Sequence, residues 1–114
     1  METNTKIQDA VAQYKTACIL QGQAFDKGNF KKANKYFEEE TKCVDFLKEN
    51  NALNELFPFL YEEDENLRIS TAAVLMHIET NACLAVLNDI ANKSHGVNKI
   101  NAEMTISEFK KRHI

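Results

Sequence analysis

Cysteines and histidines are the side chains of this 114-residue sequence that could act as nucleophiles or bind metals. They are spread along the chain as Cys18, Cys43, Cys83, His77, His95 and His113. An odd number of cysteines at wide, irregular spacing argues against a disulfide framework and a zinc motif, so we expect small buried thiols. No two histidines lie three or four residues apart, as two metal ligands on one helix must. The sequence therefore predicts no metal site and no cofactor.

Two runs of carboxylates could supply general acids and bases, Glu38-Glu39-Glu40 and Glu62-Glu63-Asp64-Glu65. Catalytic carboxylate pairs need desolvated, opposed side chains, whereas adjacent acids on a helix or turn point in different directions. The three isolated glycines do not form a phosphate-binding loop, and no Ser-His-Asp or Cys-His arrangement can be inferred. We expect solvated acidic faces and a protein that is not an enzyme.

Charge is distributed unevenly, although the net charge is only −3. Residues 51–92 contain seven acids and one base, a net charge of −6, whereas residues 1–50 balance eight against eight. Residues 93–114 contain five bases and two acids, a net charge of +3. Acidic segments attract basic partners and repel phosphate backbones. The candidate binding surface is therefore acidic and consists of Glu62, Glu63, Asp64 and Glu65.

Three polar residues are expected to have structural roles. Arg68 is the single base within residues 51–92, and we expect it to pair with Asp64 or Glu65; contact with a partner is the alternative. Gln21 and Asn34 lie near the end of one predicted helix and the start of the next. Polar side chains there more often satisfy local backbone groups than bind ligands, and recognition is again the alternative.

Helices must position all of these residues, because the sequence has only three glycines and one proline and its apolar residues recur every three or four positions. The pattern predicts five or six helices in a single domain over residues 1–114, and the first two should form an antiparallel hairpin. The expected ranges are 5–25, 30–48, 52–61, about 66–78, 81–92 and 106–112. Residues 97–104 are ambiguous, and Pro58 should shorten or kink the third helix.

Local motifs define the predicted helix ends and the predicted core. Thr5 with Gln8, and Thr105 with Glu108, have capping-box spacing. Gly28 should end the first helix and Asn29 should cap the second. Large apolar residues are expected on the buried stripes, among them Phe25, Phe30, Phe37 and Ile78. The small residues of Ser70-Thr71-Ala72-Ala73 should allow a neighbouring helix to approach closely.

Four separated motifs resemble a small bacterial family that has a HEAT-like helical repeat fold and no assigned activity. They are Gln21-Gly22-Gln23-Ala24 with Asn29-Phe30-Lys31-Lys32-Ala33-Asn34, then Leu56-Phe57-Pro58-Phe59-Leu60, then Leu67-Arg68, and finally Ala102-Glu103-Met104-Thr105-Ile106. The resemblance implies an all-α fold, a helical hairpin followed by HEAT-like antiparallel helix pairs. It implies no reaction, cofactor or site.

The function that the sequence favours is a non-catalytic protein-interaction module. One concrete form is an inhibitor or immunity-type protein that neutralises a basic partner. The alternatives are a nucleic-acid-binding or repair-type HEAT-like protein, which the charge balance makes less favoured, and a structural homo-oligomer. No apolar run approaches the roughly 18 residues that span a bilayer, and residues 1–15 do not resemble a signal peptide. We expect a cytoplasmic protein with no membrane partner.

Overall fold

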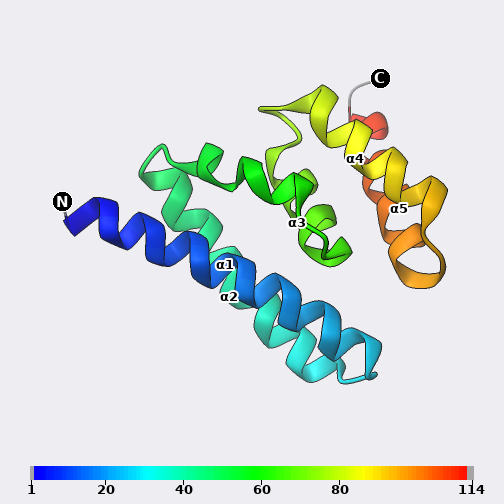
Figure 1. Cartoon of the computed structure of the whole chain (residues 1–114), viewed down its shortest axis with the longest axis horizontal. Helices are drawn as coiled ribbons and strands as arrows, with labels where there is room; N and C mark the ends of the chain where they lie inside the picture. Colours follow the sequence, from blue (N-terminus) through cyan, green and yellow to red (C-terminus); the bar gives the residue numbers. More distant parts are fainter. Residues whose placement is uncertain (1, 113–114) are drawn as a thin grey trace. The chain divides into compact units, whose positions relative to one another are not determined.

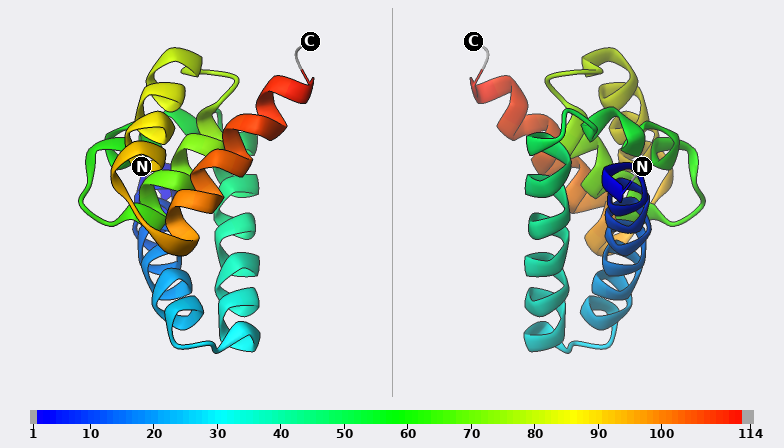
Figure 2. Two further views of the ribbon diagram at one scale, coloured as in Figure 1. Left: turned by 90° about the vertical axis from the view of Figure 1, so that its right-hand side faces the viewer. Right: turned by 90° about the vertical axis from the view of Figure 1, so that its left-hand side faces the viewer.

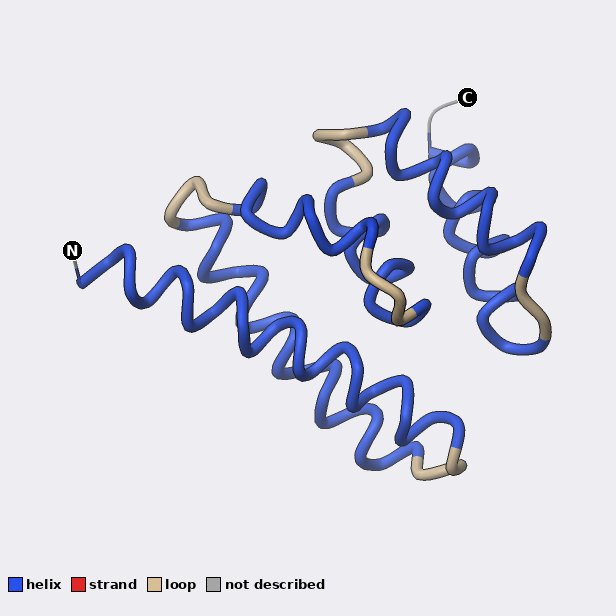
Figure 3. Tube along the Cα trace, viewed as in Figure 1, coloured by secondary structure: helices blue, strands red, loops and turns tan. Residues whose placement is uncertain are grey.

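The computed structural model describes residues 2–112, and every regular element within them is a helix (Figures 1 and 3). The elements are α1 (Glu2–Asp26), α2 (Phe30–Glu49), the 3₁₀ helix η1 (Leu53–Tyr61), α3 (Glu65–Leu75), α4 (Thr80–Lys93) and α5 (Gly96–Arg112). The predicted all-α fold with five or six helices is confirmed. Within the single domain predicted over residues 1–114, the chain divides into two compact units, the first ending at Phe57 and the second beginning at Pro58.

The first unit is built on an antiparallel hairpin of α1 and α2, as the sequence predicts (Figure 2). Gly28 has a φ of +73°, a left-handed conformation that costs glycine little and closes α1. The side chain of Asn29 then accepts a hydrogen bond of 3.2 Å from the backbone N–H of Lys32, which caps α2. The proposed cap at Thr5 is wrong, because α1 begins at Glu2 and Thr5 lies inside it.

The buried face of this hairpin combines small and large side chains. Ala10, Ala17 and Ala24 are buried at seven-residue intervals along α1. Ala33, Glu40 and Leu47 are buried at the same interval along α2. A seven-residue repeat keeps the same face turned toward a neighbouring helix, and Tyr14, one turn after Ala10, is fully buried as well.

Three phenylalanines that the sequence places in the core are instead exposed. Phe25 is 43%, Phe30 57% and Phe37 56% exposed, and the rings of Phe25 and Phe30 meet edge to face with their centres 5.2 Å apart. The expectation of buried rings at these three positions is wrong; the aromatic ring buried in α1 is that of Tyr14, which is 0% exposed. Glu40, expected on a solvated face, is buried at 4% exposure.

The segment after α2 departs from α-helical geometry for local reasons. Asn51 has a φ of +53°. The N–H of Ala52 donates a hydrogen bond of 2.8 Å to the carbonyl of Leu47, and this bond closes the C-terminal end of α2. The predicted third helix is a 3₁₀ helix, η1, with Pro58 inside it. Proline lacks a backbone N–H and its ring clashes with the carbonyl four residues earlier, so α-helical hydrogen bonding cannot continue through Pro58.

In the second unit, α4 packs against both α3 and α5, and α3 also contacts α5. Asp64 caps α3 by accepting a hydrogen bond of 2.9 Å from the backbone N–H of Leu67. The last helix is longer than predicted, because residues 97–104 are helical and continuous with it. Thr105 therefore does not start a helix; its hydroxyl donates to the carbonyl of Asn101, one turn earlier. Ile78, expected in the core, is 54% exposed because α3 ends at Leu75.

Replacing Ala72 with leucine tests the close packing of α3. Ala72 is fully buried, so Ala72→Leu should lower the free energy of unfolding by about 1–3 kcal/mol through overpacking. The neighbouring Ala73 is exposed, and Ala73→Leu should change stability by less than about 0.5 kcal/mol. Urea unfolding followed by circular dichroism measures both. Equal stability of the two variants would contradict the packing described for α3.

Candidate functional site

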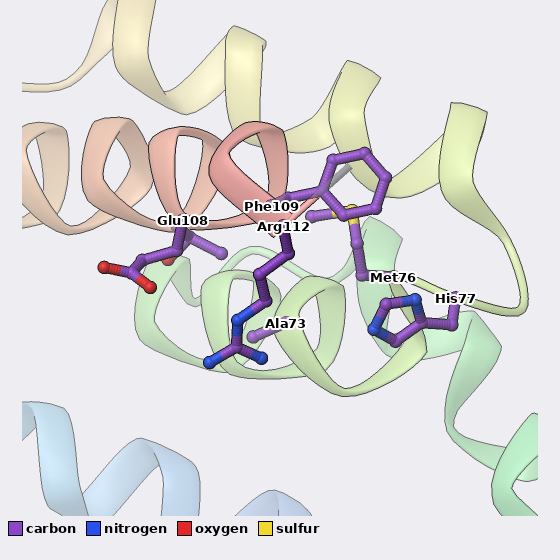
Figure 4. Close-up of a pocket in the computed structure, with 7 residues that line it drawn as sticks. Ala73, Met76, His77, Glu108, Phe109 and Arg112 are labelled. Carbon is purple, nitrogen blue, oxygen red and sulfur yellow. The ribbon is translucent and has the colours of Figure 1, made fainter. Parts of the chain in front are cut away.

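A pocket of about 280 Å³ lies between the end of α3 and the last turns of α5 (Figure 4). Its lining comprises Ala73, Met76, His77, Thr105, Glu108, Phe109 and Arg112. The α5 residues lie at spacings of three and four, so they share one face of that helix. The pocket therefore depends on α5 continuing without interruption to Arg112.

The pocket has an apolar floor and a polar rim. Met76 is 4% exposed, and the ring of Phe109 lies with its centre 6.1 Å from the ring centre of His77, at an interplanar angle of 52°. Glu108 and Arg112 are exposed at the rim, and Figure 4 shows their charged groups directed away from the ring of Phe109. An apolar floor with charges around it is the arrangement by which protein interfaces bury one anchoring side chain.

The pocket is large enough for one side chain or a small apolar group. Its volume of about 280 Å³ lies near the lower end of the range usual for small-molecule sites, about 300–1,000 Å³. Within residues 2–112, the structure contains no group of three or more His, Cys, Asp or Glu side chains that could hold a metal ion. The floor of Met76 and Phe109 beside Glu108 and Arg112 suits recognition of an apolar group next to opposite charges.

The four acids proposed as a binding surface do not act alike. Asp64 is occupied as the cap of α3. Glu65 accepts hydrogen bonds from the hydroxyl of Ser94 and, at 2.9 Å, from the amide of Asn98. Glu65 thus ties the start of α3 to the junction of α4 and α5. Of the other two acids, Glu62 is half-buried and Glu63 is exposed, so Glu63 is the most accessible acid of this surface.

Arg68 pairs with a residue that the sequence did not indicate. Its Nη1 lies 3.8 Å from the Oδ2 of Asp89 on α4, whereas Asp64 and Glu65 serve the contacts described above. The predicted partners are wrong because α3 and α4 pack side by side and bring residues 21 positions apart together. The same Asp89 accepts a hydrogen bond of 2.7 Å from Lys93.

The remaining predicted residues lie outside the pocket. Gln21 is half-buried on α1, and Asn34 is exposed on α2 beside Lys31 and Lys35 in an open surface depression. The three cysteines are buried, as predicted. Burial, with a smaller contribution from Glu79, raises the pKa of the Cys83 thiol to about 11, which keeps it protonated at neutral pH.

Sequence reasoning missed the pocket residues. The sequence indicated His77 only as one of the possible metal ligands, and Arg112 only as one of the five bases within residues 93–114. The signal that could have found the pocket is the spacing of Thr105, Glu108, Phe109 and Arg112 on one helix face. That signal has meaning only once residues 97–112 form one helix.

Comparison with known proteins supports the fold. No protein-family model matches the sequence, and no curated protein matches it. The crystal structure of the protein RPA1889 from Rhodopseudomonas palustris CGA009 superimposes with a TM-score of 0.85, covering 92% of this chain and 88% of that one at 17% sequence identity. The likeness shows a shared all-α fold. No helix within residues 2–112 combines the length and the apolar character needed to cross a bilayer.

Alanine variants of Glu65 and Glu63 test which of these two acids stabilises the fold. Glu65→Ala should lower the free energy of unfolding by about 1–3 kcal/mol, because it removes the charged carboxylate that accepts hydrogen bonds from Ser94 and Asn98. Glu63→Ala should change it by less than about 0.5 kcal/mol, since Glu63 is exposed. Urea unfolding measures both, and a Glu65 variant as stable as the Glu63 variant would contradict the structural role.

Proposed function

We propose that this chain is a non-catalytic protein-interaction module that anchors a partner in the pocket between α3 and α5. The observation that carries the proposal is the apolar floor of Met76 and Phe109 within a rim of His77, Glu108 and Arg112. Arginines and aromatic residues around a desolvated pocket dominate binding energy at protein interfaces. An apolar side chain of the partner would fill the pocket, and polar groups of its backbone would meet the rim.

The outer face of α5 extends the same surface. Val97, Ile100 and Met104 are 46%, 53% and 59% exposed and share one face of α5, roughly opposite the fully buried Ala102. Met104 lies one turn before Glu108, so this stripe continues into the rim of the pocket. A helix with apolar residues on two opposite faces is typical of one that contacts a partner.

The finer form of the proposal is an inhibitor or immunity-type protein that acts on a basic partner in the bacterial cytoplasm. Its support is the net charge of −6 over residues 51–92 and the resemblance to a bacterial HEAT-like family. Exposed acids would attract the partner over a distance, and the pocket would hold it afterwards. A homo-oligomer is the second candidate, because the apolar stripe on α5 could also meet a second copy.

The first test blocks the pocket. Ala73→Lys places a long charged side chain at its edge, while Ala12→Lys makes the same change at an exposed alanine of α1. Candidate partners are proteins that co-purify with the wild type and with Ala12→Lys, but not with Ala73→Lys. Each candidate is then purified, and its affinity for the wild type and for both variants is measured. We expect Ala73→Lys to weaken binding at least tenfold. If every captured protein binds both variants alike, the pocket is not the interface; a dimer in sedimentation that Ala73→Lys dissociates would favour the homo-oligomer.

The second test concerns the acids. Replacing Glu62 and Glu63 with glutamine should slow association with a basic partner and reduce its dependence on salt, because exposed charge steers encounter. Stability should change by less than about 1 kcal/mol. The matched control replaces Glu38 and Glu39 of α2, two exposed acids of the first unit. Stopped-flow association at several salt concentrations measures the effect, and equal rates for both double variants would exclude the basic-partner form.

A further inference from the structure

A second recess in the same unit contains an arginine whose hydrogen-bonding capacity is unused. This groove, of about 330 Å³, is lined by Leu60, Tyr61, Arg68, Ala82, Ala85, Val86 and Asp89. Ala85, Val86 and Asp89 lie three, four and seven residues after Ala82, so these four residues share one face of α4, which forms one wall of the groove. The end of η1 contributes Leu60 and Tyr61, and α3 contributes Arg68. We call this recess the Arg68 groove.

The guanidinium of Arg68 has five N–H donors but makes little use of them. Its Nη1 lies 3.8 Å from the Oδ2 of Asp89, a distance that permits charge attraction but exceeds a hydrogen bond. Its Nε is buried and has no hydrogen-bond partner within the described residues. The side chain as a whole is 20% exposed, so its outer nitrogens remain within reach of a ligand in the groove.

Asp89 leaves the positive charge of Arg68 largely available. The Oδ1 of Asp89 accepts a hydrogen bond of 2.7 Å from Lys93, and this bond holds the pKa of Asp89 below its ordinary value. Two cations therefore share one carboxylate, which gives this cluster a net charge of +1. This excess positive charge attracts an anion and repels a cation.

The rest of the groove is apolar or aromatic. Tyr61 is 66% exposed at its edge, Val86 and Leu60 are buried, and Ala82 and Ala85 leave room above α4. Arginine binds carboxylates through two parallel N–H groups, and an exposed tyrosine ring offers a flat contact for a ring or a branched chain. A volume of about 330 Å³ lies in the usual range for a small ligand.

We propose that the Arg68 groove binds a carboxylate carried on an aromatic or branched apolar body. The carboxylate would take the outer nitrogens of Arg68 while Asp89 stays with Lys93. The body would lie between Tyr61 and the alanines of α4. This site is separate from the pocket between α3 and α5, and its ligand chemistry stands independently of the partner proposed for that pocket.

The experiment titrates the full chain, labelled with nitrogen-15, with sodium benzoate and with benzamide, which has the same ring but no charge. We expect benzoate to bind saturably, to shift the side-chain Nε–H signal of Arg68 together with backbone signals around Tyr61 and Ala85, and to bind at least tenfold more tightly than benzamide. Equal affinity for the two compounds, or shifts confined to other parts of the chain, would overturn the proposal.

Variants of Ala85 test the site without altering Arg68. Ala85 is exposed, so neither Ala85→Glu nor Ala85→Gln should disturb folding, which thermal unfolding checks. The glutamate variant supplies its own carboxylate to Arg68 and should bind benzoate at least tenfold more weakly than the glutamine variant, which has nearly the same size. Identical affinities in these two variants would contradict binding at Arg68.

Two sources could supply such a carboxylate, and peptides distinguish them. The probes are N-acetylphenylalanine, the peptide acetyl-Gly-Gly-Phe with a free carboxylate, and the same peptide amidated. Tenfold tighter binding of the free-acid peptide than of N-acetylphenylalanine identifies a polypeptide C-terminus, and equal binding identifies a free carboxylic acid. An amidated peptide that binds as tightly as its free acid would overturn the carboxylate assignment.

Discussion

Burial of the contacting helix faces is the constraint on which the rest of this structure depends. In the first unit, Tyr14, Leu47 and three alanines of α1 are buried, whereas Phe25, Phe30 and Phe37 are exposed. In the second unit, the fully buried Ala72 and Ala102 mark the contacting faces of α3 and α5, while Val97, Ile100 and Met104 face outward. The buried faces stabilise the fold, and the large apolar side chains left exposed provide surface for recognition.

Polar residues contribute to the second unit mainly by joining elements that are distant in sequence. Glu65 receives hydrogen bonds from Ser94 and Asn98, and Lys99 donates to the carbonyl of Ala91 at 2.6 Å, so the junction of α4 and α5 is held on two sides. This junction directs α5 across α3, and α5 carries most of the pocket lining. The acids therefore have two kinds of role: Asp64 and Glu65 build the scaffold, and Glu63 remains available to a partner.

The pocket and the Arg68 groove use different faces of the second unit and suit different chemistry. The pocket lies between α3 and α5, with opposite charges around an apolar floor that matches one anchoring side chain. The groove lies along α4, and its charge balance favours an anion because Arg68 and Lys93 share the single carboxylate of Asp89. Neither recess needs a reactive nucleophile, and Cys83, whose pKa burial raises to about 11, is completely buried.

The sequence by itself determined the all-helical class, the hairpin of α1 and α2, the cap at Asn29 and the turn at Gly28, because these follow from local backbone preferences and periodic apolar residues. It determined only part of the buried core, because Phe25, Phe30 and Ile78 have the spacing of core residues but are exposed. It also did not show that Arg68 meets Asp89, or that α5 is one helix carrying half a pocket. Helical periodicity specifies the side of a helix on which a residue lies, whereas only tertiary packing decides which side meets a neighbour and how much room remains there.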